Sequence, residues 1–108
     1  MNMNEFNNDI IKVIYMIKRK PLGYLGELSI SKLRCFIDGF SFGYDYPKFH
    51  PFINEFQEYI ENKYKCYSNS WNNILLSYAK DEEVALELFF NEFSNFLKKN
   101  SIEEPHIE

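Results

Sequence analysis

The side chains of this chain that could do chemistry are two histidines, two cysteines and several closely spaced glutamates. His50 lies between Phe49 and Pro51 at the start of a helical pattern, where it could serve as a base or a pH switch. A partly buried histidine with a structural role is the commoner case, and we expect that role here. His106 stands far along the chain, close to its C-terminal end, so we expect the two histidines not to share a metal.

The two cysteines fit ordinary packing better than catalysis. Cys35 follows Arg34 in a helical pattern with no base at suitable spacing, so we expect a small core side chain rather than a nucleophile. Cys66 follows Lys65 in a more open stretch, where its thiol could be accessible without being catalytic. Two cysteines do not make a disulfide framework, and a bridge or a shared metal is the minority alternative.

Two pairs of glutamates have the spacing that places both carboxylates on one helix face. Glu55 and Glu58 are three residues apart, and Glu83 and Glu87 are four apart. Such pairs occur in glycosidases and metal sites, but they are also routine on solvated helix faces. Neither pair has a histidine at Glu-x-x-His spacing, which favours the solvated face. We therefore expect no catalytic residue, no cofactor and no metal.

The elements that must position these residues are helices, because apolar side chains recur three and four residues apart and strand-like alternation is weak. The spacing predicts five helices, over about 4–19, 30–40, 49–64, 71–78 and 81–99. Pro21 ends the first helix, Ser29 or Ser31 caps the second, and Asp81 caps the last. From Pro21 to Leu28 the two glycines predict a structured loop that packs as an elbow.

Length and composition bound the fold. A chain of 108 residues with 45% hydrophobic and 19% aromatic side chains supports one buried core and not two. The prediction is all-α: a single compact domain over residues 1–99, with about five helices in an irregular, antiparallel-leaning helical bundle, and a frayed C-terminal tail over 100–108. Six large side chains are expected in the core: Phe36, Phe56, Trp71, Leu88, Phe89 and Phe93.

The charge pattern argues against two classes of partner. Sixteen acidic and twelve basic side chains give a formal net charge of −4, and no basic stripe could track a phosphate backbone, so we expect no nucleic acid partner. The apolar stretch 10–17 is interrupted by Lys12 and followed by three basic residues. It is too short for a membrane span and has the reverse charge order of a secretory peptide. We expect a cytoplasmic protein with no membrane partner.

Several segments between about residues 10 and 97 resemble a group of small bacterial proteins. The resemblance rests on Arg19-Lys20-Pro21-Leu22-Gly23-Tyr24-Leu25-Gly26, Ser29-Ile30-Ser31-Lys32-Leu33, Phe36-Ile37-Asp38-Gly39-Phe40, Trp71 and the Phe-rich last helix. These segments are similar to immunity proteins of toxin systems, of the contact-dependent growth inhibition type, whose pattern is Arg-Pro-x-Met-Tyr-Leu-Gly. The chain departs from that pattern by having Lys20 in place of the arginine and Leu22-Gly23 in place of the x-Met pair.

The resemblance implies a stoichiometric inhibitor that binds a cognate toxin domain, a protein, and is a monomer or weak dimer when free. An acidic surface and an aromatic loop would suit capture of a basic toxin, since charge complementarity speeds association and buried aromatics slow release. From polarity and loop position alone, our hypothesis for the toxin-facing surface is Tyr44, Asp45, Tyr46, Glu55, Glu58, Glu61, Glu83 and Glu87.

Two other classes of function stay open. A non-catalytic adaptor or a homo-oligomerising helical domain would use the same aromatic loop. A small enzyme is the weaker alternative, because it would need a pocket that gathers Cys66, His50 or a carboxylate pair.

Overall fold

The computed structural model describes residues 3–43 and 46–105, and it describes side chains over 9–40 and 52–105. The described backbone is helical throughout its regular elements, which confirms the all-α prediction. In chain order the helices are α1 (Met3–Arg19), α2 (Pro21–Leu25), α3 (Ile30–Gly43), α4 (Tyr46–Tyr64), α5 (Trp71–Ser77) and α6 (Glu82–Lys99).

The prediction of five helices was one too few over the described residues, because the segment expected to be a loop begins with the short helix α2. Pro21 occupies the first turn of α2, where its missing N–H costs nothing. Gly26 ends the helix at φ 81°, and its N–H donates to the Leu22 carbonyl oxygen at 2.9 Å. The Leu25 side chain is buried. A single helical turn is too short to produce an apolar period, so spacing could not reveal it.

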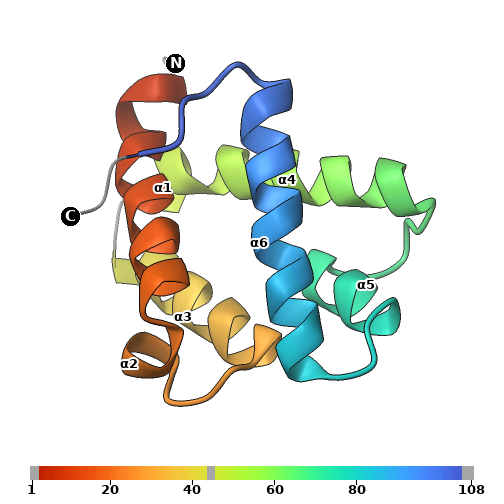
Figure 1. Cartoon of the computed structure of the whole chain (residues 1–108). Coiled ribbons are helices and arrows are strands. Elements are labelled where there is room, and N and C mark those ends of the chain that lie inside the picture. Colours follow the sequence, from red (N-terminus) through yellow and green to blue (C-terminus); the bar gives the residue numbers. More distant parts are fainter. Residues whose placement is uncertain (1–2, 44–45, 106–108) are drawn as a thin grey trace.

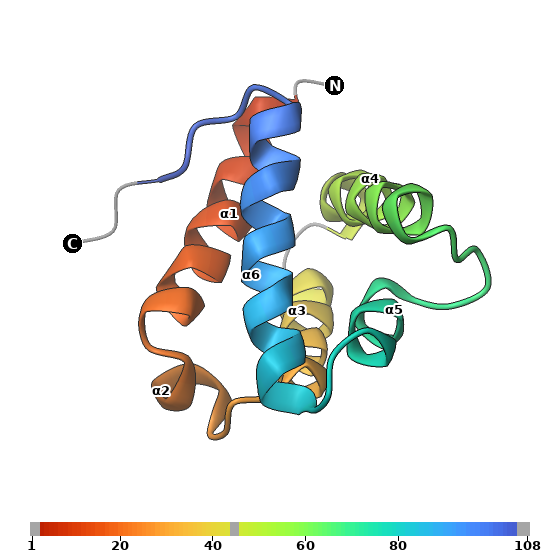
Figure 2. The same cartoon turned by 45° about the vertical axis from the view of Figure 1, so that its right-hand side comes forward.

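The helices pack around α6, which lies at the centre of the molecule (Figure 1). In this view α1 and α6 run in opposite directions, whereas α4 passes behind α6 and across it. After a turn of 45° α4 is seen almost along its axis, beside α3 and α5 (Figure 2). The molecule is therefore a compact helical bundle in which neighbouring helices cross as well as run antiparallel. None of the described helices is long and apolar enough to cross a membrane.

Aromatic side chains of α4, α5 and α6 form the centre of the core. Phe56, Trp71, Phe89 and Phe93 are each at most 2% exposed, which confirms four of the six predicted core residues. Phe36 and Leu88 are only partly buried, so the prediction was wrong in degree for these two. They occupy the edges of their helical stripes, and Phe36 packs edge-on against the exposed ring of Tyr24, 6.4 Å between centroids.

Side-chain caps begin two of the helices as the sequence predicts. Asp81 caps α6, its Oδ1 accepting from the Val84 N–H at 2.9 Å. Of the two candidate serines, Ser29 precedes α3 and is the cap, and its Oγ accepts from the Lys32 N–H at 3.1 Å. These bonds satisfy backbone donors that have no partner inside the helix.

Two smaller regions differ from the expected picture. Cys35 is exposed and does not belong to the core, because it lies on the outer face of α3, between the buried Leu33 and Ile37. Residues 101–105, which the sequence predicts to be frayed, leave the helix but keep contacts: the Ile102 side chain packs on the core, and the Ser94 hydroxyl donates to the Glu104 carboxylate.

Candidate functional site

The predicted toxin-facing residues fall into three groups. Tyr44 and Asp45 lie outside the described residues, and the side chain of Tyr46, the first residue of α4, lies outside the described side chains. Three of the glutamates belong to the second half of α4: Glu55, Glu58 and Glu61. The other two, Glu83 and Glu87, are exposed in the first half of α6.

A groove of about 230 Å³ brings two of the α4 glutamates, Glu55 and Glu58, against the C-terminal part of α6, whereas Glu61 does not line it. Seven residues line it: Glu55, Glu58, Tyr59, Asn62, Phe96, Lys99 and Asn100. Neither Glu55 nor Glu58 forms an ion pair with any described residue. Their charges are therefore available to a cation brought by a partner.

The groove is not uniformly acidic. The Lys99 ammonium lies 5.4 Å from the centre of the Tyr59 ring, and the Lys63 ammonium lies 5.9 Å from the same centre. Both distances are within the range of a cation–π contact. The groove thus combines two carboxylates that have no ion partner among the described residues with a tyrosine ring that already lies near two ammonium groups.

Glu83 and Glu87 do not belong to this groove. Glu87 precedes Phe96, which lines the groove, by nine residues, or about 14 Å along the helix axis. The acidic residues that polarity alone placed in one hypothetical surface therefore form two separate patches. We call the groove around Glu55 and Glu58 the acidic groove.

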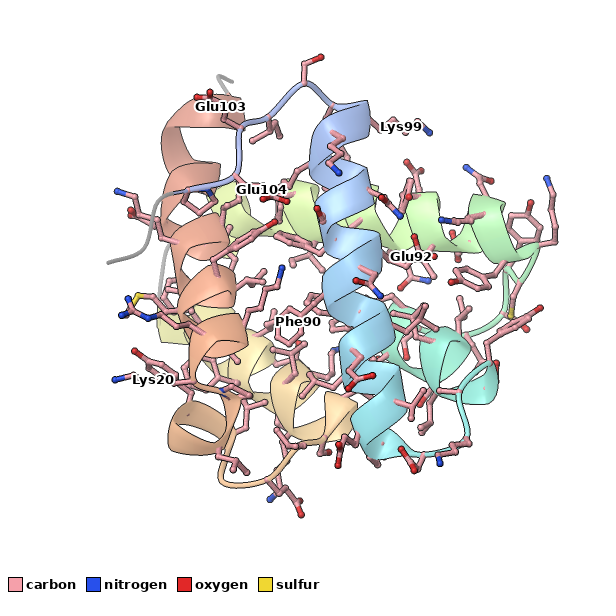
Figure 3. The ribbon with its side chains drawn as sticks, viewed as in Figure 1. Lys20, Phe90, Glu92, Lys99, Glu103 and Glu104 are labelled. Carbon is pink, nitrogen blue, oxygen red and sulfur yellow. The ribbon has the colours of Figure 1, made fainter. Side chains whose placement is uncertain are left out.

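One buried carboxylate was missed by sequence reasoning. Glu92 points from α6 toward the end of α4 (Figure 3), and its side chain is 4% exposed. It accepts from the Lys63 ammonium at 2.6 Å, from the Tyr59 hydroxyl at 3.3 Å and from the Tyr64 hydroxyl. Burial by itself would raise the pKa of the Glu92 carboxyl, but the hydrogen bonds from Lys63 and Tyr64 outweigh it and hold that pKa below its usual value.

A sequence signal for this group exists. Glu92 stands three residues after Phe89 and four before Phe96, both of which belong to the apolar stripe of α6. A carboxylate on a buried stripe needs a partner. The sequence did not reveal that the partner is Lys63, because 29 residues separate the two.

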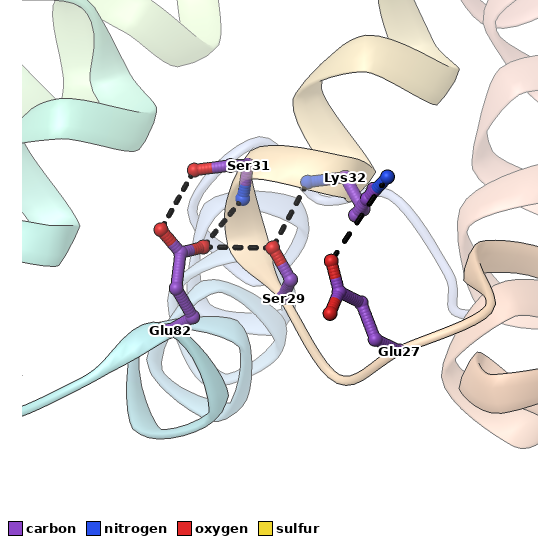
Figure 4. A network of polar contacts seen from close by, with 5 residues as sticks. All are labelled: Glu27, Ser29, Ser31, Lys32 and Glu82. Carbon is purple, nitrogen blue, oxygen red and sulfur yellow. Dashed lines mark hydrogen bonds and ion pairs between the residues drawn. The ribbon is translucent and has the colours of Figure 1, made fainter.

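A second missed carboxylate joins α6 to the start of α3 (Figure 4). Glu82 accepts from the Ser31 N–H at 2.9 Å and from the Ser29 and Ser31 hydroxyls at 2.8 Å each. These donors, the Ser31 N–H foremost, lower the pKa of the Glu82 carboxyl. The groove beside it, about 350 Å³, is also lined by Glu27, Lys32 and the exposed Cys35. Since Glu82 already occupies the N-terminus of α3, we interpret this cluster as structural.

Replacing Glu82 with alanine is expected to lower the free energy of unfolding by about 1–2 kcal/mol, because two hydroxyls and one N–H lose their acceptor while remaining close to water. Glu83→Ala is the matched control: it removes a carboxylate from the same helical turn, but Glu83 accepts no hydrogen bond in the described part of the chain. Chemical denaturation of both variants measures the difference. Equal losses would mean that the helix dipole, and not the tie to α3, accounts for the effect.

The described side chains show no cluster suited to a metal: no group of three or more His, Cys, Asp or Glu is close enough to hold one. Cys66 is half-buried, and the side chains of His50 and His106 lie outside those described. No family model matches this chain, and neither a curated protein nor a solved structure shows significant similarity to it. The resemblance to immunity proteins therefore stays an expectation from the sequence.

Proposed function

We propose that this protein is a non-catalytic, stoichiometric inhibitor of the immunity type, which binds a toxin domain in the cytoplasm through its acidic groove. The observation that carries the proposal is the acidic groove itself, where Glu55 and Glu58 lie beside the Tyr59 ring and have no ion partner in the described part of the chain. Unpaired carboxylates attract a basic partner from a distance and raise the rate of association. Tyr59 adds aromatic contact area beside them, and its ring already lies near the Lys63 and Lys99 ammonium groups.

Because the two acidic patches are separate, charge reversal in one can be compared with charge reversal in the other. Reversing both groove charges, Glu55→Lys with Glu58→Lys, is expected to lower affinity at least about tenfold for the toxin domain encoded beside this gene, and to weaken the salt dependence of binding. Reversing Glu83 and Glu87 changes the net charge equally, but these residues lie outside the groove. Titration calorimetry of the purified pair at two salt concentrations measures both effects.

The control decides between a site and a general charge effect. If the α6 reversal weakens binding as much as the α4 reversal, overall charge and not the acidic groove is responsible. If neither reversal changes affinity or its salt dependence, the acidic groove is not the binding surface. If no toxin domain is encoded beside the gene and none is neutralised in growth assays, the immunity function is wrong.

Exposed tyrosines support the second candidate, a homo-oligomerising or adaptor domain. Tyr67, in the connection from α4 to α5, and Tyr78, directly after α5, are each 62% exposed. The ring centroids of Tyr78 and Tyr64 are 4.8 Å apart. Exposed aromatic surface of this kind is typical of interfaces. Sedimentation velocity over a range of concentrations separates the two functions: a monomer throughout supports the inhibitor, and a stable dimer that Tyr78→Ser abolishes supports the alternative.

A further inference from the structure

The corner formed by the end of α1 and by α2 has the opposite charge to the chain as a whole. Residues 10–26 contain no aspartate or glutamate, although the chain has a net charge of −4. The same segment contains four basic residues, Lys12, Lys18, Arg19 and Lys20, and all four are exposed. The acidic surplus of the protein therefore lies entirely outside this corner.

Most of these cations have no ion partner among the residues that the structure describes. Lys12, Arg19 and Lys20 form no ion pair with any described residue. Lys18 differs, since it lies over the Tyr15 ring at 5.3 Å. Its charge also adds to the hydrogen bonds from Ser94 and Tyr15 that lower the pKa of the Glu104 carboxyl. The charges of Lys12, Arg19 and Lys20 are thus not balanced by a described carboxylate, and they favour the binding of an anion at this corner.

The same segment exposes three large apolar side chains. Met16, Leu22 and Tyr24 are 38%, 60% and 41% exposed, and they are three of the five large apolar side chains that the described surface exposes. Met16 lies one helical turn after Lys12 and one before Lys20, whose N–H donates to the Met16 carbonyl oxygen at 3.2 Å. Lys12, Met16 and Lys20 thus follow one another at one-turn spacing along the second half of α1 and its end.

The corner is held rigidly and projects from the molecule. Leu25 anchors α2 by its buried side chain, and the Tyr24 ring packs edge-on against Phe36. The exposed side chains of α2 are therefore carried by a packed helical turn. α2 lies at one extremity of the molecule, away from α4 and α5 (Figures 1 and 2). Neither of the two grooves described above includes any residue of the corner.

We propose that this corner binds the surface of a membrane containing anionic lipid, with Lys12, Arg19 and Lys20 at the headgroups and the tips of Met16, Leu22 and Tyr24 among them. Basic and apolar side chains mixed on a projecting surface are the chemistry that binds a lipid interface, where each cation adds to the attraction and each apolar tip leaves water. The inference goes beyond the proposed function and revises the expectation of no membrane partner, which considered only spanning segments.

Vesicle co-sedimentation of the whole chain tests this proposal without any toxin. We expect binding to vesicles of phosphatidylcholine mixed with phosphatidylglycerol and none to phosphatidylcholine alone. Raising NaCl from about 0.1 M to about 1 M, which shortens the Debye length from about 10 Å to about 3 Å, should release the protein. Arg19→Glu with Lys20→Glu should lower the partition coefficient at least about tenfold, and Leu22→Ser with Tyr24→Ser should lower it about as much.

The control variant is Lys65→Glu with Lys80→Glu, which makes the same change in net charge at exposed residues distant in sequence from the corner. It should bind the mixed vesicles nearly as well as the unaltered chain, and thermal melts verify that every variant is folded. Binding that the control reduces as strongly as the corner variant would overturn the proposal, as would equal binding to both kinds of vesicle. Retention on heparin or double-stranded DNA with no vesicle binding would overturn it in favour of a general polyanion site.

Discussion

Replacing Phe56 with alanine is expected to lower the free energy of unfolding by about 3–5 kcal/mol, the cost typical of emptying a buried phenylalanine site. Phe56 is 2% exposed. Its ring centroid lies between 5.4 and 5.7 Å from those of four aromatic residues on α5 and α6: Trp71, Phe89, Phe93 and Phe96. One side chain of α4 thus contacts both other helices of the aromatic core, and no neighbour can fill the space it leaves without moving a helix.

The loss is large against the whole stability of a small domain, about 5–15 kcal/mol. Urea denaturation followed by circular dichroism measures it. Phe90→Ala is the matched control, because Phe90 carries the same side chain on α6 but is only partly buried, with a ring contact to Phe89. The control should lose about 1–2 kcal/mol. Equal losses for the two variants would contradict the placement of Phe56 at the centre of the core.

The second large effect is expected at the ion pair between α4 and α6. Replacing Lys63 with methionine leaves the Glu92 carboxylate, whose side chain is 4% exposed, without its counter-ion. Breaking a buried pair in this way costs about 3–5 kcal/mol, but the Lys63 side chain is 43% exposed, so water already screens part of the interaction. We expect a loss of about 2 kcal/mol at neutral pH.

A double-mutant cycle with Glu92→Gln shows whether the loss belongs to the pair. Glutamine keeps the shape of the side chain and an acceptor for the Tyr64 hydroxyl, but it removes the buried charge. Lys63→Met should therefore cost much less in the Glu92→Gln background, with a coupling of at least about 1 kcal/mol. Additive losses would mean that the two side chains contribute independently.

The pH dependence of the free energy of unfolding distinguishes a lost ion pair from lost packing, because only the ion pair depends on the charge of Glu92. In the unaltered protein the pKa of Glu92 is below its ordinary value of 4.5, so its contribution to stability is present above that value and is lost as the pH falls through the folded-state pKa. Without Lys63, burial dominates and raises the pKa of Glu92. The Lys63→Met variant should therefore regain stability relative to the unaltered protein as the pH falls from 7 toward 5.

Within each helix, the sequence predicted well what neighbouring residues determine. Asp81 caps α6 as expected because a cap bonds to an N–H only three residues away. The stripe of α6 was predicted because side chains at helical spacing share a face. Local patterns failed where one turn forms the whole element, as in α2, and where a residue stands at the edge of a stripe, as Phe36 and Leu88 do.

The candidate site was predictable in type but not in position. Polarity identified the glutamates of α4 and α6 as surface residues, and Glu58, Glu83 and Glu87 are exposed. Their division into the acidic groove and a separate patch depends on how α4 crosses α6, for which no stretch of sequence is diagnostic.

The amino-acid sequence by itself determined that this chain folds as helices, where most of them begin and end, and which face of each is buried, because those properties depend on residues within a turn or two of one another. Only the tertiary structure decided the roles of the acidic residues. Glu82 bonds to Ser29 across 53 positions of the chain and Glu92 to Lys63 across 29, while Glu55 and Glu58 remain without ion partners in the described structure. Whether a carboxylate is paired depends on which helices lie next to each other. That arrangement is determined by the close packing of all the core side chains together.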